Sequence, residues 1–168
     1  MMRIRPFRTS DTQYIRSWIT SDKVHYLWSA GRIPFGFDEE TLCQRLKEEE
    51  NENVSAFTAI LEDGTPVGFF CISLELSQNN GFMKYIIVDG NKRGMGYGSQ
   101  MVMLATKYAF EILQFDSVRL SVFDNNLPAR KAYEKVGFQE INHTKDAFTY
   151  QDEKWGRYIL QVKAQQEQ

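Results

Sequence analysis

Residues 86–98 read Ile-Ile-Val-Asp-Gly-Asn-Lys-Arg-Gly-Met-Gly-Tyr-Gly, and this stretch restricts the fold more than any other part of the chain. An apolar run typical of a strand ends at Val88, and a short polar turn follows it. A helix with apolar residues at i, i+3 and i+4 spacing is predicted over 97–113. Strand, glycine-rich turn and helix start together indicate an anion site, because the first helical N–H groups have no partner within the helix. A diphosphate is the expected ligand.

The spacing of the glycines distinguishes this turn from two common phosphate-binding loops. The stretch lacks the Gly-x-Gly-x-x-Gly of dinucleotide-binding domains, and it is not followed by the Gly-Lys-Ser/Thr of a Walker A loop. It does fit Arg/Gln-x-x-Gly-x-Gly/Ala, filled by Arg93, Gly96 and Gly98. That pattern is similar to the pyrophosphate loop of the GNAT superfamily of acyl-CoA N-acyltransferases. A glycine-rich helix start without a ligand is the alternative interpretation of this motif alone.

A second motif follows at 126–138, where the residues fit Asn-x-x-Ala-x-x-x-Tyr-x-x-x-Gly-Phe. Alternating apolar residues predict a strand directly before it, over 117–123. Pro128 in the first turn and Gly137 at the end predict a helix over 127–136. The pattern resembles the second conserved block of the same superfamily. Two motifs in the expected order are much more specific than either one alone.

The rest of the sequence is compatible with the fold that this resemblance implies. Further strands are expected at 3–8, 54–61, 67–76 and 82–88, with a closing pair at 138–148 and 154–162, and further helices at 9–19, 22–28 and 39–50. We expect an α+β fold with a mostly antiparallel, twisted sheet of about seven strands, splayed in the middle and flanked by about four helices. A single domain is expected over 1–163, followed by a disordered tail over 164–168.

Composition argues against several other classes of protein. The chain has 168 residues with a net charge of −2, so it has no basic footprint for nucleic acid. Its apolar runs are shorter than the roughly 20 residues that cross a bilayer, and its start does not resemble a signal peptide. Cys43 and Cys71 lack metal-ligand spacing, and His25 and His143 stand apart. We therefore expect a cytoplasmic protein without a metal site and without a nucleic-acid or membrane partner.

The resemblance implies where acetyl-CoA binds. In the GNAT fold its pantetheine arm enters the gap between the strand that precedes the pyrophosphate loop and the next strand of the sheet. The edge of the first strand, the loop and the following motif would contact the cofactor. The residues implied in this way are Ile86, Ile87, Val88, Arg93, Gly94, Met95, Gly96, Tyr97, Gly98, Ser99, Asn126 and Tyr133.

The resemblance also implies the chemistry, in which an amine attacks the thioester, a tetrahedral intermediate forms and the CoA thiolate leaves. Tyr133 is the candidate that protonates the thiolate, and a tyrosine of the hydrophobic core is the alternative. Asn126 either bonds the arm of the cofactor or only caps its helix. A backbone N–H near Val88 is the expected donor to the oxyanion.

The general base is where this chain departs from several members of the superfamily. They carry a glutamate on the strand before the loop, whereas this chain reads Phe-Met-Lys-Tyr at 82–85. Glu75 is the catalytic candidate in its place, with His25 and Tyr26 as further options. Deprotonation at pH 7 costs about 4.6 kcal/mol for a lysine-type ammonium and about 1 kcal/mol for a peptide α-ammonium. A site without a strong base therefore favours an α-amine or another weakly basic amine.

The sequence as a whole predicts an N-acetyltransferase that uses acetyl-CoA and either a small-molecule amine or a protein N-terminus. The segments 3–8 and 154–158 loosely resemble the branch that includes ribosomal-protein N-terminal acetyltransferases. A non-catalytic acyl-CoA-binding module is the alternative. Trp28, Phe35 and Phe37 either line an acceptor pocket or belong to the core. The expected oligomeric state is a monomer or a homodimer.

Overall fold

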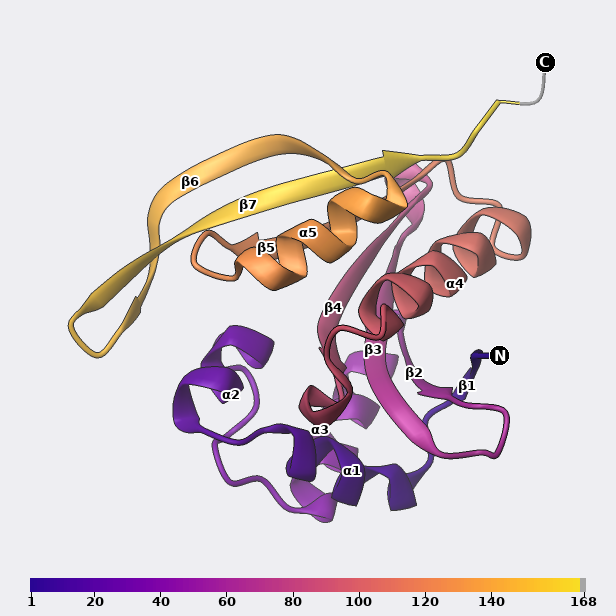
Figure 1. The fold of residues 1–168 in the computed structure, drawn as a ribbon. Helices are drawn as coiled ribbons and strands as arrows, with labels where there is room; N and C mark the ends of the chain where they lie inside the picture. The colour runs from indigo at the N-terminus through magenta and orange to yellow at the C-terminus, as the bar shows by residue number, and fades with distance from the viewer. Residues whose placement is uncertain (167–168) are drawn as a thin grey trace.

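A seven-stranded sheet runs through the computed structural model, which describes residues 1–166 (Figure 1). The strands follow the order β1-β2-β3-β4-β5-β7-β6 across the sheet. They are β1 (Arg3–Pro6), β2 (Val54–Ile60), β3 (Pro66–Glu75), β4 (Asn80–Val88), β5 (Ser117–Phe123), β6 (Gln139–Tyr150) and β7 (Glu153–Lys163). The helices are α1 (Thr12–Trp18), α2 (Asp22–Ser29), α3 (Glu39–Glu50), α4 (Tyr97–Glu111) and α5 (Leu127–Val136). The expected α+β fold is confirmed, with five α-helices where about four were expected.

The predicted tail at 164–168 falls partly on residues 167 and 168, which lie outside the described residues. In the described part of the chain, no helix combines the length and the apolar character needed to cross a membrane.

The sheet opens between its fourth and fifth strands. All neighbouring strands are antiparallel except β4 and β5, which are parallel and pair only over 80–83 and 117–120. The second halves of both strands, 84–88 and 121–123, are not paired with each other within residues 1–166. The expected splay is therefore confirmed, and Figure 1 shows β4 leaving the part of the sheet that contains β5, β7 and β6.

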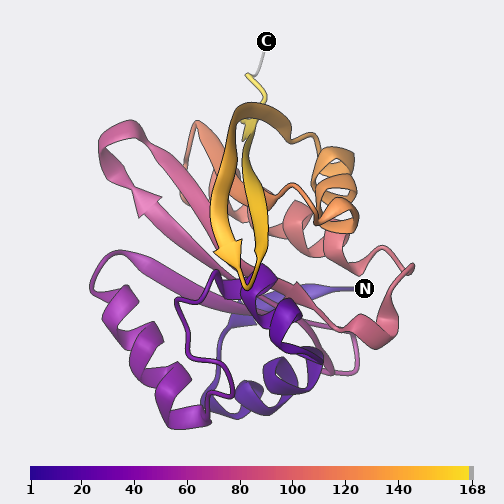
Figure 2. The same ribbon diagram turned by 90° about the vertical axis from the view of Figure 1, so that its left-hand side faces the viewer.

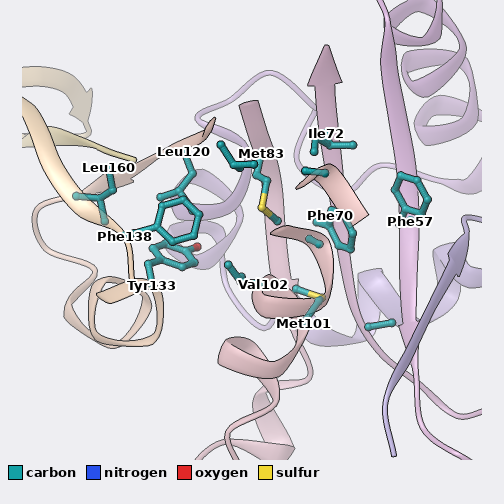
Figure 3. Packing of buried hydrophobic residues seen from close by; sticks show 14 of the residues in the cluster. Phe57, Phe70, Ile72, Met83, Met101, Val102, Leu120, Tyr133, Phe138 and Leu160 are labelled. Atoms are coloured by element: carbon teal, nitrogen blue, oxygen red, sulfur yellow. The ribbon is translucent and has the colours of Figure 1, made fainter. Parts of the chain in front are cut away.

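Two hydrophobic cores cover the two faces of the sheet. Side chains alternate along a strand, so Phe70 and Ile72 of β3 face the core with α4 and α5, while Phe69 and Cys71 face the core with α1, α2 and α3. Burial on both faces explains the continuous apolar run at 67–72. Figure 2 shows α3 and α4 on opposite sides of the strands, and Figure 3 shows the first of these cores from close by.

A β-bulge bends β4 where the sheet opens. Phe69 pairs with Ile87 but Cys71 pairs with Lys84, so β4 contains one more residue than β3 over this stretch. Tyr85 lies in the bulge with φ of +54°, a left-handed conformation that is rare for a bulky residue. Its carbonyl accepts a hydrogen bond from Trp28 Nε1 at 2.8 Å. Because a bulge bends its strand, we attribute the divergence of β4 from β5 to this feature.

Candidate active site

Two cavities lie where β4 and β5 separate, and they share a wall. The loop cavity, of about 500 Å³, lies against the glycine-rich segment 92–99 and α5. The hairpin cavity, of about 350 Å³, lies against the turn after α2 and the hairpin formed by β6 and β7. The residues that line both cavities are Leu27, Trp28, Ile86, Asn126, Ala129 and Tyr133.

The start of α4 forms one end of the loop cavity. Gly94 and Gly96 have φ of +78° and +75°, a left-handed backbone that explains glycine at both positions. Gly96 is the N-cap residue, and the N–H of Gln100 donates to its carbonyl at 3.0 Å. The N–H groups of residues 97–99 therefore have no acceptor within the helix. An ideal Cβ at Gly94 or Gly96 would meet nothing within 4 Å, so the backbone there borders open space.

The charge of the loop cavity suits an anion. Lys92, Arg93 and Lys135 line it, and none of its lining residues within the described chain is acidic. The dipole of α4 adds partial positive charge at the same end. All residues expected to bind the cofactor line this cavity except Met95, a residue that is 57% exposed. The sequence motifs did not single out Lys92 and Lys135, whose positions depend on the path of the loop and of α5.

Tyr133 lies at the junction of the two cavities. Its ring packs in the core, with a centroid 6.2 Å from that of Phe138, as Figure 3 shows. Its hydroxyl forms no hydrogen bond with another residue in 1–166, and burial raises the pKa of this hydroxyl. A buried tyrosine with a high pKa keeps its proton at neutral pH. It can therefore donate that proton to an atom placed at the junction.

Asn126 reaches both cavities from the start of α5. Its side chain makes no capping hydrogen bond in the described structure, although Asn126 occupies the N-cap position. Of the two roles considered for Asn126, the structure therefore does not show the capping of α5 by its side chain. The side-chain amide remains free to bond a ligand at the junction.

The three candidate bases do not lie against either cavity. Glu75 lies at the end of β3, paired with Asn80 near the closed end of the sheet. His25 is buried in α2, and its Nε2 lies 2.6 Å from the carbonyl oxygen of Ile33. Tyr26 packs on Tyr150, with ring centroids 5.3 Å apart. The structure thus brings Tyr133 and Asn126 together but not Glu75.

A buried carboxylate supports the bulge from the far side of β4. Glu49 of α3 accepts a hydrogen bond from the Tyr85 hydroxyl at 2.7 Å and lies 3.3 Å from Lys84 Nζ. Arg45 lies 3.6 Å from the same carboxylate. Burial and the hydrogen bond to Glu49 raise the pKa of the Tyr85 hydroxyl. Sequence reasoning missed this network, because only tertiary packing brings α3 against β4.

The hairpin cavity has a different set of charges. The charged side chains that line it are Arg32, Lys84 and Arg157. Within the described residues, no aspartate, glutamate or histidine lines it. Trp28 lines both cavities, whereas Phe37 is buried in the core and Phe35 is exposed, so of these three aromatic residues only Trp28 borders the site. Residues 1–166 contain no group of three His, Cys, Asp or Glu side chains arranged to hold a metal ion.

Both the sequence and the fold of this chain are similar to those of known proteins. The sequence profile of the acetyltransferase (GNAT) family matches residues 14–138. An N-acetyltransferase 9-like protein of Caenorhabditis briggsae is 21% identical over 150 residues, which are 83% of this chain and 75% of that protein. The SPbeta prophage-derived uncharacterized N-acetyltransferase YokL of Bacillus subtilis is 25% identical over 135 residues, covering 80% and 69%.

Solved structures match the fold over nearly the whole chain. The spermidine N-acetyltransferase of Vibrio cholerae, in complex with CoA and spermine, superposes with a TM-score of 0.82 and 16% identity. The match covers 96% of this chain and 95% of that chain. A chimera of the same bacterial enzyme with hSSAT gives a TM-score of 0.81, also at 16% identity and with the same coverage.

Proposed function

The chain belongs to the acetyltransferase (GNAT) family, and on that basis we propose that its loop cavity binds acetyl-CoA and its hairpin cavity receives the acceptor amine. The protein is an N-acetyltransferase that moves an acetyl group from acetyl-CoA to a primary amine. The observation that carries the assignment of the cavities is the position of Tyr133, on the wall where both cavities meet.

The residues of the loop cavity fit acetyl-CoA. The free N–H groups of residues 97–99 and the side chains of Lys92 and Arg93 would hold the diphosphate. The edge of β4 at 86–88, which β5 leaves unpaired, would bond the pantetheine arm. When bound, acetyl-CoA supplies a thioester whose carbonyl carbon accepts the amine and whose sulfur leaves as a thiolate.

The chain's own groups would then do three things at the junction. A backbone N–H within 86–88 donates to the thioester oxygen as negative charge develops on it. Asn126 orients the reacting arm through its side-chain amide. The Tyr133 hydroxyl donates its proton to the departing sulfur. Its raised pKa keeps that proton available throughout the neutral range.

The acceptor must lose a proton before it attacks, and the hairpin cavity favours weakly basic amines. Its lining contains no carboxylate or imidazole among the described residues, so the cavity offers no strong base. The positive charges of Arg32, Lys84 and Arg157 disfavour the ammonium form and so lower the pKa of a bound amine. A peptide α-amine or a similar small amine meets these conditions. The polyamine seen in the Vibrio cholerae structure carries several positive charges, which this cavity would repel.

Calorimetry and a CoA-release assay test the proposal together. We expect the protein to bind acetyl-CoA and, at pH 7, to release CoA faster with free peptide N-termini than with lysine-type amines or polyamines. Binding without release for every acceptor would support a non-catalytic acyl-CoA-binding module. An absence of binding would contradict the assignment of the loop cavity.

We further propose that residues 1–163 act as one domain in the cytoplasm, as a monomer or a homodimer. Cys43 and Cys71 are both unpaired, which suits a reducing compartment. Light scattering during size-exclusion chromatography measures the oligomeric state directly.

A further inference from the structure

We propose that the acceptor amine also carries an anionic group, a carboxylate or a phosphate, which pairs with Arg32 and Arg157 in the hairpin cavity. The inference rests on the proposed function, because it names the class of amine that the second cavity accepts. It starts from the charges of that cavity, which come from three separate elements.

The positive charges converge although the residues lie far apart in the sequence. Arg32 follows α2, Lys84 lies in β4 and Arg157 lies in β7, and all three line the same cavity. Figure 1 shows α2 facing the hairpin of β6 and β7 across the opening of the sheet. Glu49 partly neutralises Lys84, but its own side chain is only 5% exposed and does not line the cavity. The cavity therefore keeps an excess of positive charge.

Two of the three cations have no carboxylate partner. Arg32 and Arg157 form no salt bridge with another residue in 1–166, and both are exposed. Each guanidinium presents several N–H donors in a planar fork that matches a carboxylate or a phosphate. Charged side chains that face one cavity without a counter-ion are well placed to bind an anionic ligand.

The backbone that carries these arginines is well defined. Ala30 and Gly31 both have positive φ, and the turn that they form is closed by a 3.0 Å hydrogen bond from the N–H of Arg32 to the carbonyl of Ser29. Arg157 lies within a paired strand, opposite Phe123 of β5 and Thr144 of β6. Side chains alternate along β7, which places Arg157 on the same face as Ile159, another residue of the cavity lining. The positions of both charges are therefore set by paired or closed backbone.

The arrangement discriminates between acceptors by charge. A carboxylate or phosphate on the acceptor would gain charge-assisted hydrogen bonds, whereas a second ammonium would meet two unpaired cations. The donor phosphates do not compete for the same residues, because Arg32 and Arg157 line the hairpin cavity and not the loop cavity.

Matched peptide acceptors test this inference on the full chain with acetyl-CoA. The peptides share an N-terminal alanine and differ at the next position, which is aspartate, glutamate, phosphoserine, glutamine or lysine. We expect kcat/KM to be at least about tenfold higher for the acidic peptides than for the glutamine peptide, which corresponds to about 1.4 kcal/mol. A preference for aspartate and glutamate assigns a carboxylate, and a preference for phosphoserine assigns a phosphate.

Substitutions of the two arginines test whether the preference for acidic peptides arises in the hairpin cavity. Arg157→Gln and Arg32→Gln should each reduce the acidic-to-neutral ratio, and Arg157→Glu should move the preference toward the lysine peptide. The matched control is Arg3→Gln, which removes an exposed arginine from β1 at the far edge of the sheet and should leave the ratio unchanged. Thermal unfolding of each variant checks that it folds.

The inference and the proposed function fail in different ways. Equal kcat/KM values for acidic and neutral peptides, or higher values for the lysine peptide or a polyamine, would overturn the inference and leave the acetyltransferase assignment intact. If acetyl-CoA binds but no amine releases CoA, the proposed function fails, and calorimetry with the N-acetylated peptides then decides the inference. Equal affinities for the acidic and neutral acetylated peptides in that experiment would overturn it.

Discussion

Tyr133 is a residue of the hydrophobic core, and this position is compatible with the proposed role of its hydroxyl as an acid. Its ring is part of the hydrophobic core beside Phe138, and Tyr133 also lines both cavities. The core holds the ring in place, and the hydroxyl bonds no other residue of the described chain, which leaves it available for the proposed proton donation. A tyrosine of this kind should tolerate loss of its oxygen without loss of the fold.

The substitution Tyr133→Phe should therefore lower kcat without affecting stability or acetyl-CoA affinity. We expect a loss of about 100-fold or more, the effect of removing a general acid. Steady-state kinetics, calorimetry with acetyl-CoA and thermal unfolding measure the three quantities. Because burial raises the pKa of Tyr133 above its usual value of about 10, the wild-type rate should show no alkaline fall from this group below that pH. An unchanged kcat in the variant would remove Tyr133 from the mechanism.

Single residues were predictable from the sequence where a motif fixed their neighbours. Asn126 and Tyr133 belong to one motif that runs from the N-cap of α5 into the helix, so helical geometry keeps them close together. Glu75 was chosen for its chemical type alone, and the structure places it away from both cavities. Glu49 was not singled out, because its contact with Tyr85 joins α3 to β4.

At the scale of elements, the start of α4 offers a test of the acetyl-CoA site that does not disturb the fold. An ideal Cβ at Gly98 would meet only Ala132 Cβ, at 3.9 Å, and Gly98 lies within the helix. A small side chain therefore fits the protein there, and an acidic one also suits the first turn of a helix. Gly96 does not offer this test, because any side chain at its φ of +75° is strained.

We expect Gly98→Asp to weaken acetyl-CoA binding by at least about tenfold, or about 1.4 kcal/mol, because a carboxylate at the start of α4 repels the diphosphate in the loop cavity. Calorimetry measures the affinity, and thermal unfolding checks that the variant folds. Gly98→Ala is the matched control and should bind acetyl-CoA normally, because the motif admits alanine at this position. Unaltered binding in Gly98→Asp would place the phosphates elsewhere.

Elements bounded by clear stop signals were predicted well. The predicted spans of β5 at 117–123 and α5 at 127–136 agree with the structure, since Pro128 and Gly137 define the ends of the helix. The bulge in β4 was not predicted, because Tyr85 is not a residue type that signals a left-handed backbone. Its conformation depends on Trp28 and Glu49, which are distant in sequence.

At the scale of the whole molecule, Asp11 ties the first elements of the chain to the sheet. Its carboxylate accepts two hydrogen bonds from Arg5, at 2.8 and 2.9 Å, one from the Thr58 hydroxyl at 2.8 Å and one from the Arg8 N–H at 2.8 Å. The helix predicted from residue 9 begins as a 3-10 turn at Thr9–Asp11, which contains this aspartate, and α1 itself starts at Thr12.

The network predicts a loss of stability in acid. Burial alone would raise the pKa of Asp11, but the hydrogen bonds from Arg5, Arg8 and Thr58 outweigh it and lower the pKa below the usual value. The ionised Asp11 carboxylate therefore stabilises the folded protein fully above a pH of about 4, the pKa of an aspartate in the unfolded chain. This stabilisation is lost as the pH falls through the lower pKa that Asp11 has in the folded protein. Asp11→Asn should lower the free energy of unfolding at pH 7 by about 3 kcal/mol. Its stability should then depend less on pH below about 4 than that of the wild type.

Urea unfolding followed between pH 7 and pH 3 measures both effects. Asp63→Asn is the matched control, since Asp63 accepts its hydrogen bond within an exposed turn. If Asp11→Asn matched the wild type at pH 7, the carboxylate would not be holding these elements together.

The overall topology was predictable because two motifs between residues 86 and 138 sit at the opening of the sheet. The hairpin cavity was not, because its walls come from segments near residues 30, 84, 122 and 157, which only the folded chain brings together. Periodicity reports the burial of each segment separately and does not say which segments face each other across a gap.

The residues assigned to the donor and those of the terminal hairpin lie in separate parts of the chain, so mutations can reach one without the other. The parts assigned to the acetyl donor, from β4 to α5, form one continuous stretch inside the segment that matches the family profile. Arg157 lies in the terminal hairpin, outside that segment. On the proposed assignment of the cavities, mutations in the hairpin would change the acceptor that the enzyme uses without changing the stretch that binds the donor.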